Sequence, residues 1–141
     1  MTIPIVVDTS VLISALIGQQ GPSREILRQC LQGKYTPLIS NSLFFEYEDV
    51  ISRHHILERC PLEKSEIREL LNAFYLSCTW ISIYFLWRPN IQDEGDNFLI
   101  ELAVAGNASF VVTNNLKDFG SAELVFPNLR VVTPEQMLKG D

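Results

Sequence analysis

The chain has 141 residues, a formal net charge of −6 and an isoelectric point near 4.9, with 47% hydrophobic and 20% charged residues. These values are typical of a globular protein and predict a single domain over residues 1–141. The acidic balance argues against a broad basic face for nucleic acid, although carboxylates gathered around a metal ion would give the same balance.

Membrane, secreted and disulfide-rich classes are not expected. No apolar run is long enough to cross a bilayer, and no basic segment precedes the first apolar stretch, as a signal peptide requires. The three cysteines, Cys30, Cys60 and Cys78, form no CxxC pair, which argues against a disulfide framework or a zinc site. We therefore expect a cytoplasmic protein without a membrane partner.

The first predicted element is a buried strand that ends at an acid. Residues 3–7 (IPIVV) are a short run without alternation, which predicts a strand covered on both faces of a parallel sheet. A helix follows at once from Thr9. Ligands of open α/β sheets bind beyond the carboxyl ends of the strands, so Asp8 stands where an active-site acid would lie. The alternative is that Asp8 only caps the helix.

Two further elements separate this acid from the next one. Ser23 is expected to cap a helix that stops near Gly33. Residues 35–40 (YTPLIS) are expected to form a second strand, and either Asn41 or Ser42 is expected to cap the helix that follows.

That next helix carries an acid on its inward side. Glu46 lies three residues after Leu43 and four before Val50, two members of the apolar stripe. The acids beside it, Glu48 and Asp49, are expected to face outward. A carboxylate on a buried side is costly unless a charge or a hydrogen bond meets it. Glu46 therefore either belongs to a site or extends from the boundary toward water.

The middle of the chain is expected to be structural. Residues 62–78 form a well-patterned helix, and residues 79–85 form a strand rich in β-branched and aromatic side chains. Trp80 and Trp87 are expected to be packing residues in preference to platforms for bases.

More polar residues gather late in the chain. Asp93 and Asp96 open a helix, and Asp96 stands one turn before its apolar face, which directs it toward the sheet. Asp93 is also a good helix cap. A buried strand over residues 109–113 follows, with Asn115 and then Asp118 after its carboxyl end.

The chain closes with a strand over residues 129–133 and a short helix with Pro134 at its first position. Strands that alternate with helices predict an α/β fold, with a mainly parallel central sheet and helices on both faces. If the strands at residues 3–7 and 109–113 are neighbours, the acids described above meet at one edge of this sheet.

Such a cluster favours one kind of chemistry. Oxygen-only ligands suit Mg²⁺ or Mn²⁺ better than Zn²⁺, and these ions can orient and deprotonate a water for in-line attack on a phosphodiester. Phosphatase chemistry on the same carboxylates is a lesser alternative. The sequence contains no GxGxxG or Walker P-loop motif.

Four segments resemble PIN-domain proteins, and more narrowly the bacterial VapC-like ribonuclease toxins of toxin–antitoxin systems. They are VVDTSVLISAL, SLFFEYEDVI, DEGDNFLIELAVAGNASFVVTNNLKDF and VVTPEQML, in the order expected for the family. The resemblance extends from about Ile3 to Leu138. It implies a three-layer α/β/α fold and Mg²⁺- or Mn²⁺-dependent cleavage of RNA.

By position, the resemblance assigns three catalytic acids: Asp8, Glu46 and Asp96. Asp93 is an additional acid just before the third. Ser10 matches a small polar position near the family's metal site, and Thr113 matches the threonine of the family's Thr-x-Asp motif.

The chain departs from the family at Asn115, where an aspartate is most common. An amide oxygen can bind a metal without contributing charge, and Asp118 could supply that charge from the same loop. The expected metal ligands are therefore Asp8, Glu46, Asp93, Asp96, Asn115 and Asp118. Arg53, Arg88 and Lys117 are candidate phosphate contacts, with ordinary surface charge as the alternative.

The resemblance also implies partners. These are an RNA substrate, a cognate antitoxin protein and a second copy of the chain in a homodimer. The alternative function is a PIN-like scaffold without nuclease activity, which binds RNA or a protein and whose metal site is weakened by Asn115. The two hypotheses differ in whether the chain's action requires a divalent metal.

Overall fold

The computed structural model describes residues 2–18, 20–83, 97–119, 126 and 128–140. Within these residues, five strands form a parallel sheet in the order β3-β2-β1-β4-β5. The strands are β1 (Ile3–Val7), β2 (Tyr35–Ile39), β3 (Thr79–Trp80), β4 (Phe110–Val112) and β5 (Arg130–Val132). The predicted α/β fold with a parallel sheet is confirmed.

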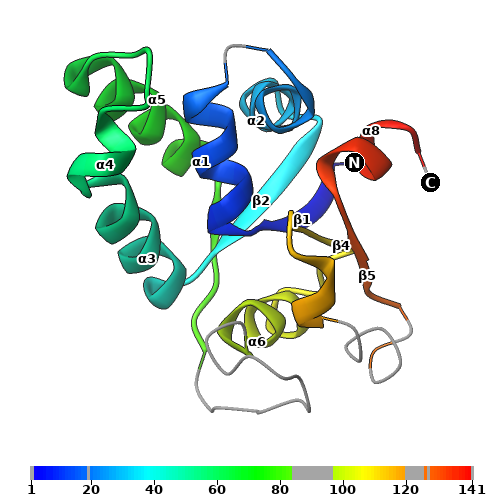
Figure 1. Ribbon diagram of the computed structural model, residues 1–141. Coiled ribbons are helices and arrows are strands. Elements are labelled where there is room, and N and C mark those ends of the chain that lie inside the picture. Colours follow the sequence, from blue (N-terminus) through cyan, green and yellow to red (C-terminus); the bar gives the residue numbers. More distant parts are fainter. Residues whose placement is uncertain (1, 19, 84–96, 120–125, 127, 141) are drawn as a thin grey trace.

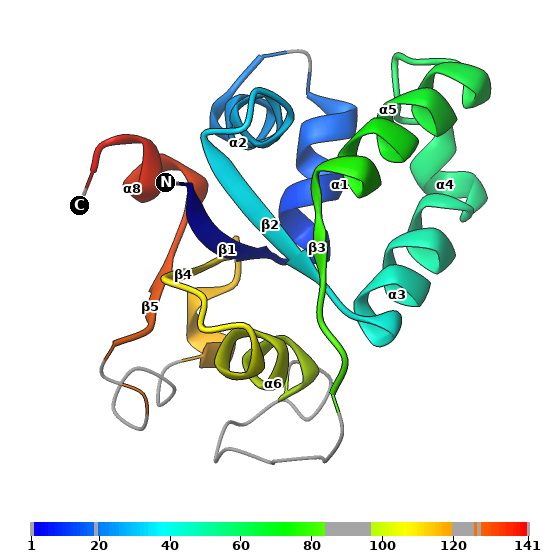
Figure 2. The same ribbon diagram turned by 180° about the vertical axis from the view of Figure 1, so that it is seen from behind.

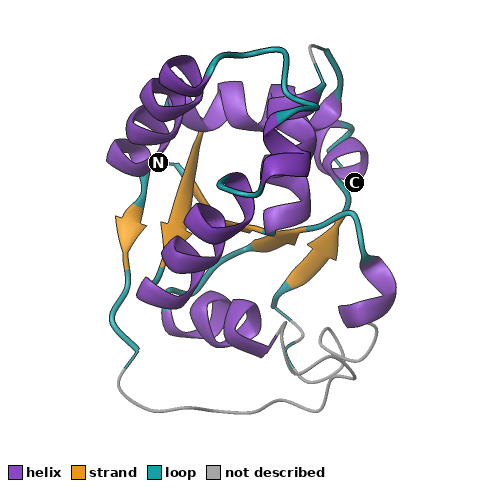
Figure 3. Cartoon of the chain, turned by 60° about the vertical axis from the view of Figure 1, so that its left-hand side comes forward, coloured by secondary structure: helices purple, strands orange, loops and turns teal. Residues whose placement is uncertain are grey.

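Helices cover the sheet on both sides (Figures 1 and 2). The described helices are α1 (Thr9–Ile17), α2 (Pro22–Leu31), α3 (Asn41–Ile51), α4 (His54–Leu57), α5 (Lys64–Ser77), α6 (Asn97–Ala105) and α8 (Pro134–Leu138), with the 3₁₀ helix η2 (Leu116–Phe119). Helix α6 packs on β1, β2 and β4 from one side, while α1 and α2 pack together on the other. Figure 3 shows the strands between these two layers, an α/β/α arrangement.

The central strands are buried on both faces, as their uninterrupted apolar sequences predict. Ile5 and Val6 of β1, and Val111 and Val112 of β4, are fully buried. In the register of these two strands, Val7 pairs with Val112. The residues that follow, Asp8 and Thr113, are therefore placed side by side at the carboxyl edge of the sheet.

Two helix starts differ from the sequence-based expectation. Helix α2 begins at Pro22 after Gly21, one residue before the predicted cap Ser23, because the fixed φ of proline suits the first helical position. Helix α3 is capped by Ser40, whose hydroxyl accepts a hydrogen bond from the Leu43 N–H at 3.2 Å. Neither Asn41 nor Ser42 is that cap.

The predicted strand over residues 79–85 is shorter in the structure. The strand itself is Thr79–Trp80, and the Ile81 N–H donates to the Ile39 carbonyl at 2.9 Å just beyond it. Residues 84–85 lie outside the described residues. The closing helix begins at Pro134 as predicted, with Thr133 as its cap.

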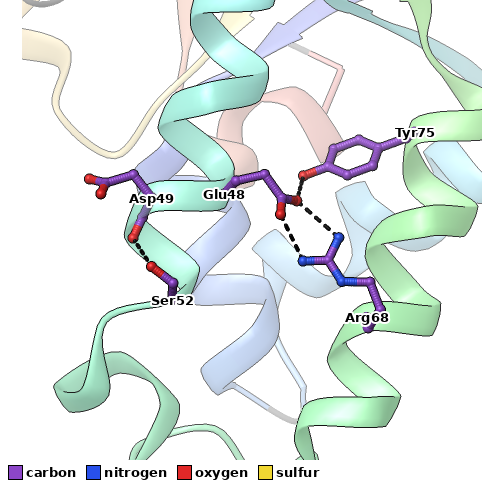
Figure 4. Close-up of polar contacts among 5 residues, drawn as sticks. All are labelled: Glu48, Asp49, Ser52, Arg68 and Tyr75. Carbon is purple, nitrogen blue, oxygen red and sulfur yellow. Dashed lines mark hydrogen bonds and ion pairs between the residues drawn. The ribbon is translucent and has the colours of Figure 1, made fainter.

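Glu48 is half-buried in a contact with a neighbouring helix, whereas helical spacing predicted an outward side chain. Its carboxylate accepts two hydrogen bonds from the Arg68 guanidinium, at 2.8 and 3.1 Å, and one from the Tyr75 hydroxyl at 2.6 Å (Figure 4). The bonds from Arg68 hold the pKa of Glu48 below its ordinary value. Because both partners belong to α5, this contact joins α3 to α5. Asp49, the next residue, is exposed as predicted.

None of the helices in the part of the chain that the structure describes is long and apolar enough to cross a membrane.

Candidate active site

Asp8 occupies the turn between β1 and α1. Its backbone carbonyl accepts the first hydrogen bonds of the helix, but its side chain takes no part in them. The Asp8 carbonyl accepts hydrogen bonds from the N–H groups of Val11 and Leu12, at 2.9 and 3.3 Å. The carboxylate makes no capping hydrogen bond. The Asp8 side chain is therefore not explained by capping, although the residue holds the cap position.

The Asp8 carboxylate is held by two hydroxyl groups. Its Oδ2 atom accepts from Thr113 Oγ1 at 2.6 Å and from Ser10 Oγ at 3.0 Å. Asp8 is 6% exposed and Thr113 is fully buried. Both donors bind one oxygen, and none of the described residues donates to Oδ1.

Glu46 reaches the same edge from α3. Its Oε2 atom accepts a hydrogen bond from the hydroxyl of Thr9, the residue directly after Asp8. Burial raises the pKa of Glu46, and the negative charge of Asp8 raises it further, while the Thr9 hydroxyl and the Arg53 charge oppose this shift. Two ionised carboxylates at one edge repel each other, and a bound cation would relieve this repulsion.

Tyr47 fixes the relation between these two acids. This buried residue follows Glu46, and its hydroxyl donates to the carbonyl of Val7 at 2.5 Å. Val7 precedes Asp8, so the bond ties the helix that carries Glu46 to the strand that carries Asp8.

The loop after β4 closes over the start of α1. Asn114 donates through Nδ2 to the carbonyl of Ser10 at 3.3 Å and to the hydroxyl of Ser14 at 3.2 Å. The Asn115 N–H donates to Thr113 Oγ1 at 3.0 Å. Thr113 therefore accepts from its own loop while it donates to Asp8, which fixes the direction of its hydroxyl.

The structure thus brings four predicted site residues together: Asp8, Ser10, Glu46 and Thr113. Asn115 lies on the same loop with its side chain exposed. Asp118 belongs to η2, where the backbone alone is described. Asp93, Asp96 and Arg88 lie outside the described residues.

The candidate phosphate contacts that are described are surface residues. Arg53 forms an ion pair with Asp49 at 2.8 Å, one turn back on α3. Lys117 is exposed on η2, near the loop that carries Asn115. The charge of Arg53 still reaches Glu46, whose pKa it lowers.

Two contributors were not predicted from the sequence: Thr9 binds Glu46, and Asn114 ties the loop to α1. Glu101 of α6 is a further buried acid, 5% exposed, that was not predicted. Glu101 lies between the buried residues Ile100 and Leu102. A charged residue inside such an apolar run was the available signal, since glutamate is seldom buried.

The donor set fits a hard divalent cation. The side-chain groups that these hydrogen bonds bring together at the edge are carboxylates, hydroxyls and an amide. No three His, Cys, Asp or Glu residues within the described parts form a complete metal cluster. The pair Asp8 and Glu46 contacts no described lysine or arginine as an ion pair, so a cation would relieve their mutual repulsion.

Comparison with known proteins identifies the family. A family model described as PIN domain matches residues 4–117, most of the chain. The chain belongs to the PIN domain family. The acids Asp8 and Glu46 of this PIN domain lie within the matched region.

A solved structure shares the fold. A chain of VapBC2 from Rickettsia felis, in a crystal structure with a DNA fragment from their promoter, matches with a TM-score of 0.56. The sequence identity is 18%, and the match covers 92% of this PIN domain and 97% of that chain. No curated protein matches the sequence significantly.

If the Asp8 carboxylate holds a metal ion, Thr113→Val should lower activity by roughly 10- to 100-fold, the usual effect of losing a group that orients a metal ligand. Valine keeps the shape of threonine but cannot donate to Asp8, so the carboxylate loses its shortest hydrogen bond. The measurement is the cleavage rate at saturating metal. Thr113→Ser retains the hydroxyl and should retain most of the rate; equal losses in both variants would contradict a role for the hydroxyl.

Proposed function

We propose that this PIN domain is a Mg²⁺- or Mn²⁺-dependent endoribonuclease. The observation that carries the proposal is the Asp8 carboxylate, which is buried at the sheet edge, oriented by Ser10 and Thr113, and unused in capping or in an ion pair with a described residue. Glu46 faces the same edge through Thr9. Both lie in the chain segment that matches the PIN domain model.

The residues proposed to hold the cation are those assigned from the sequence: Asp8, Glu46 and Asp96, with Asp93, Asn115 and Asp118 in support. A bound Mg²⁺ or Mn²⁺ supplies Lewis-acid activation of water and neutralises charge that grows on the phosphate. Ser10 and Thr113 hold Asp8 in one orientation, and Tyr47 keeps Glu46 beside it. Water is the proposed nucleophile, and no covalent enzyme intermediate is required.

We further propose that the chain is the VapC-like toxin of a toxin–antitoxin pair. The fold shared with a chain of VapBC2 supports this assignment, as does membership of the PIN domain family. Its partners would be an RNA substrate, a cognate antitoxin and, in a homodimer, a second copy. Arg53, Arg88 and Lys117 are proposed to contact phosphates of the RNA.

The direct test is cleavage of a mixed RNA pool by the purified chain with Mg²⁺, with Mn²⁺ and with chelator. Cutting that needs metal and stops in chelator is the expected result. The toxin assignment is tested separately by induced expression in a bacterial host, which should arrest growth. If a chain with a cooperative melt cuts no RNA under any of these conditions, the nuclease proposal fails, and a binding scaffold replaces it.

A further inference from the structure

Asn114, the residue after Thr113, fastens the loop that follows β4 to helix α1. Its side-chain amide donates through Nδ2 to the Ser10 carbonyl at 3.3 Å and to the Ser14 hydroxyl at 3.2 Å. Ser10 and Ser14 are one turn apart on α1, so a single amide group binds two successive turns of this helix. A carbonyl can only accept, so the nitrogen of the Asn114 amide is the atom that faces α1.

The backbone of the same loop directs both hydroxyl groups that bind Asp8. The Asn114 N–H donates to Ser10 Oγ at 3.3 Å. The Asn115 N–H donates to Thr113 Oγ1 at 3.0 Å. Each of these hydroxyls has one proton, and each donates it to Asp8 Oδ2. Two consecutive N–H groups of the loop therefore favour the orientation in which both hydroxyl protons point at the carboxylate.

The ends of this loop are anchored in the core, whereas its middle is on the surface. Thr113 is fully buried and Phe119 is 1% exposed, but residues 114–117 are exposed. Within residues 114–117, Asn114 has the side chain that is hydrogen-bonded to another element. Because exposed hydrogen bonds compete with water, these bonds should contribute little to the free energy of unfolding and act mainly on the position of the loop.

We propose that Asn114 is a positioning residue of the metal site. Its side chain holds the loop in the place from which two backbone N–H groups direct Ser10 and Thr113 toward Asp8. The same loop continues to Asn115, another proposed ligand, so the contact with α1 also sets where that residue lies relative to Asp8. The inference rests on the proposed function, because it requires a divalent cation at the sheet edge.

The test measures Mn²⁺ binding to the metal-free chain, which does not depend on RNA cleavage. Binding is followed by the electron paramagnetic resonance signal of free Mn²⁺, and each preparation is also melted in chelator. Asn114→Leu nearly keeps the shape of the side chain and removes its donors. It should weaken Mn²⁺ binding by about 10-fold, the lower end of the effect of losing a group that orients a metal ligand, since Asn114 acts through other residues. The melting temperature in chelator should stay close to that of the parent, because residue 114 is exposed.

Ser14 allows a double-mutant cycle with Asn114. Ser14→Ala removes the hydroxyl that accepts from Asn114 and leaves the contact with the Ser10 carbonyl in place. It should weaken Mn²⁺ binding by about 2- to 5-fold, as the loss of one hydrogen bond at the surface would. In the Asn114→Leu background, Ser14→Ala should have no further effect, because the donor is already absent. The control is Asn72→Leu, the same substitution at an exposed position of α5, which should bind Mn²⁺ as the parent does.

The outcomes distinguish this inference from the proposed nuclease. Equal Mn²⁺ affinities in the parent and in Asn114→Leu overturn the positioning role, even when the parent cuts RNA. Losses that add in the double variant also overturn it, because the two side chains would then act independently. If the losses are found as expected but the parent never cuts RNA, the positioning role stands and the nuclease proposal fails.

Two further results are also decisive. Should Asn114→Leu melt without cooperativity, Ser14→Ala decides the question, and an unchanged Mn²⁺ affinity in that variant overturns the positioning role. A parent chain that does not bind Mn²⁺ overturns the positioning role together with the proposed metal dependence.

Discussion

Replacement of Asp8 by asparagine is expected to abolish RNA cleavage and to leave the fold intact. Asparagine keeps the size of the side chain, and its amide oxygen can still accept from Ser10 and Thr113. It removes the negative charge that a divalent cation needs at the sheet edge. Loss of a residue that hydrogen-bonds to a metal ligand lowers metal affinity or activity by about 10- to 100-fold. Loss of the ligand itself should therefore lower the cleavage rate by at least about 100-fold.

The measurement is the cleavage rate of the RNA pool, with a thermal melt of the same preparations. Glu69→Gln is the control, because Glu69 is an exposed acid on α5 and its replacement leaves the ion pair of Arg53 intact. The control should cut as the parent does. An Asp8→Asn chain that cuts as fast as the parent would remove Asp8 from the site and, with it, the proposed mechanism.

Glu46→Gln is expected to lower the cleavage rate by a similar factor, at least about 100-fold. The same substitution is expected to stabilise the metal-free chain at neutral pH. Burial and the charge of Asp8 raise the pKa of Glu46, so the fold disfavours its ionised form. The glutamine amide can accept the Thr9 hydrogen bond without carrying that charge. The variant should therefore melt at a higher temperature than the parent in chelator at pH 7.

The sign of the pH dependence follows from the direction of this shift. A carboxyl whose pKa is raised by folding contributes most to stability below its ordinary pKa, and that contribution is lost as the pH rises through the raised value. In chelator, the melting temperature of the parent should therefore fall more between acidic and neutral pH than that of Glu46→Gln. Added Mg²⁺ or Mn²⁺ should raise the melting temperature of the parent and have little effect on the variant.

Glu69→Gln is the control for this pair of measurements, because Glu69 is exposed on α5, away from the sheet edge. It should change neither the cleavage rate nor the response to metal. Equal metal-induced shifts in the parent and in Glu46→Gln would contradict a role for Glu46 in holding the cation.

The elements of this PIN domain were readable from local sequence patterns. The uninterrupted run at residues 3–7 predicted a central strand, and the abrupt change to Asp8 placed an acid at its carboxyl end. Residue spacing along α3 placed Glu46 on the inward side. These features depend on residues that are close together in the chain, so the sequence alone was sufficient to predict them.

Contacts between distant segments were not readable in this way. Thr113 lies 105 residues from Asp8, and only the pairing of β1 with β4 brings its hydroxyl to the carboxylate. Helical spacing placed Glu48 on an outward side, but no local pattern showed that α5 would bring Arg68 and Tyr75 to meet it. Polar partners across elements depend on how whole helices and strands pack.

The sequence by itself determined the order of elements, the parallel sheet and the position of Asp8 at its edge. Only the tertiary structure decided which groups orient Asp8, and that Asp8's side chain does not cap α1. The physical reason is that hydrophobic periodicity specifies which face of an element is buried, whereas a binding site depends on the few atoms that packing brings together from separate elements.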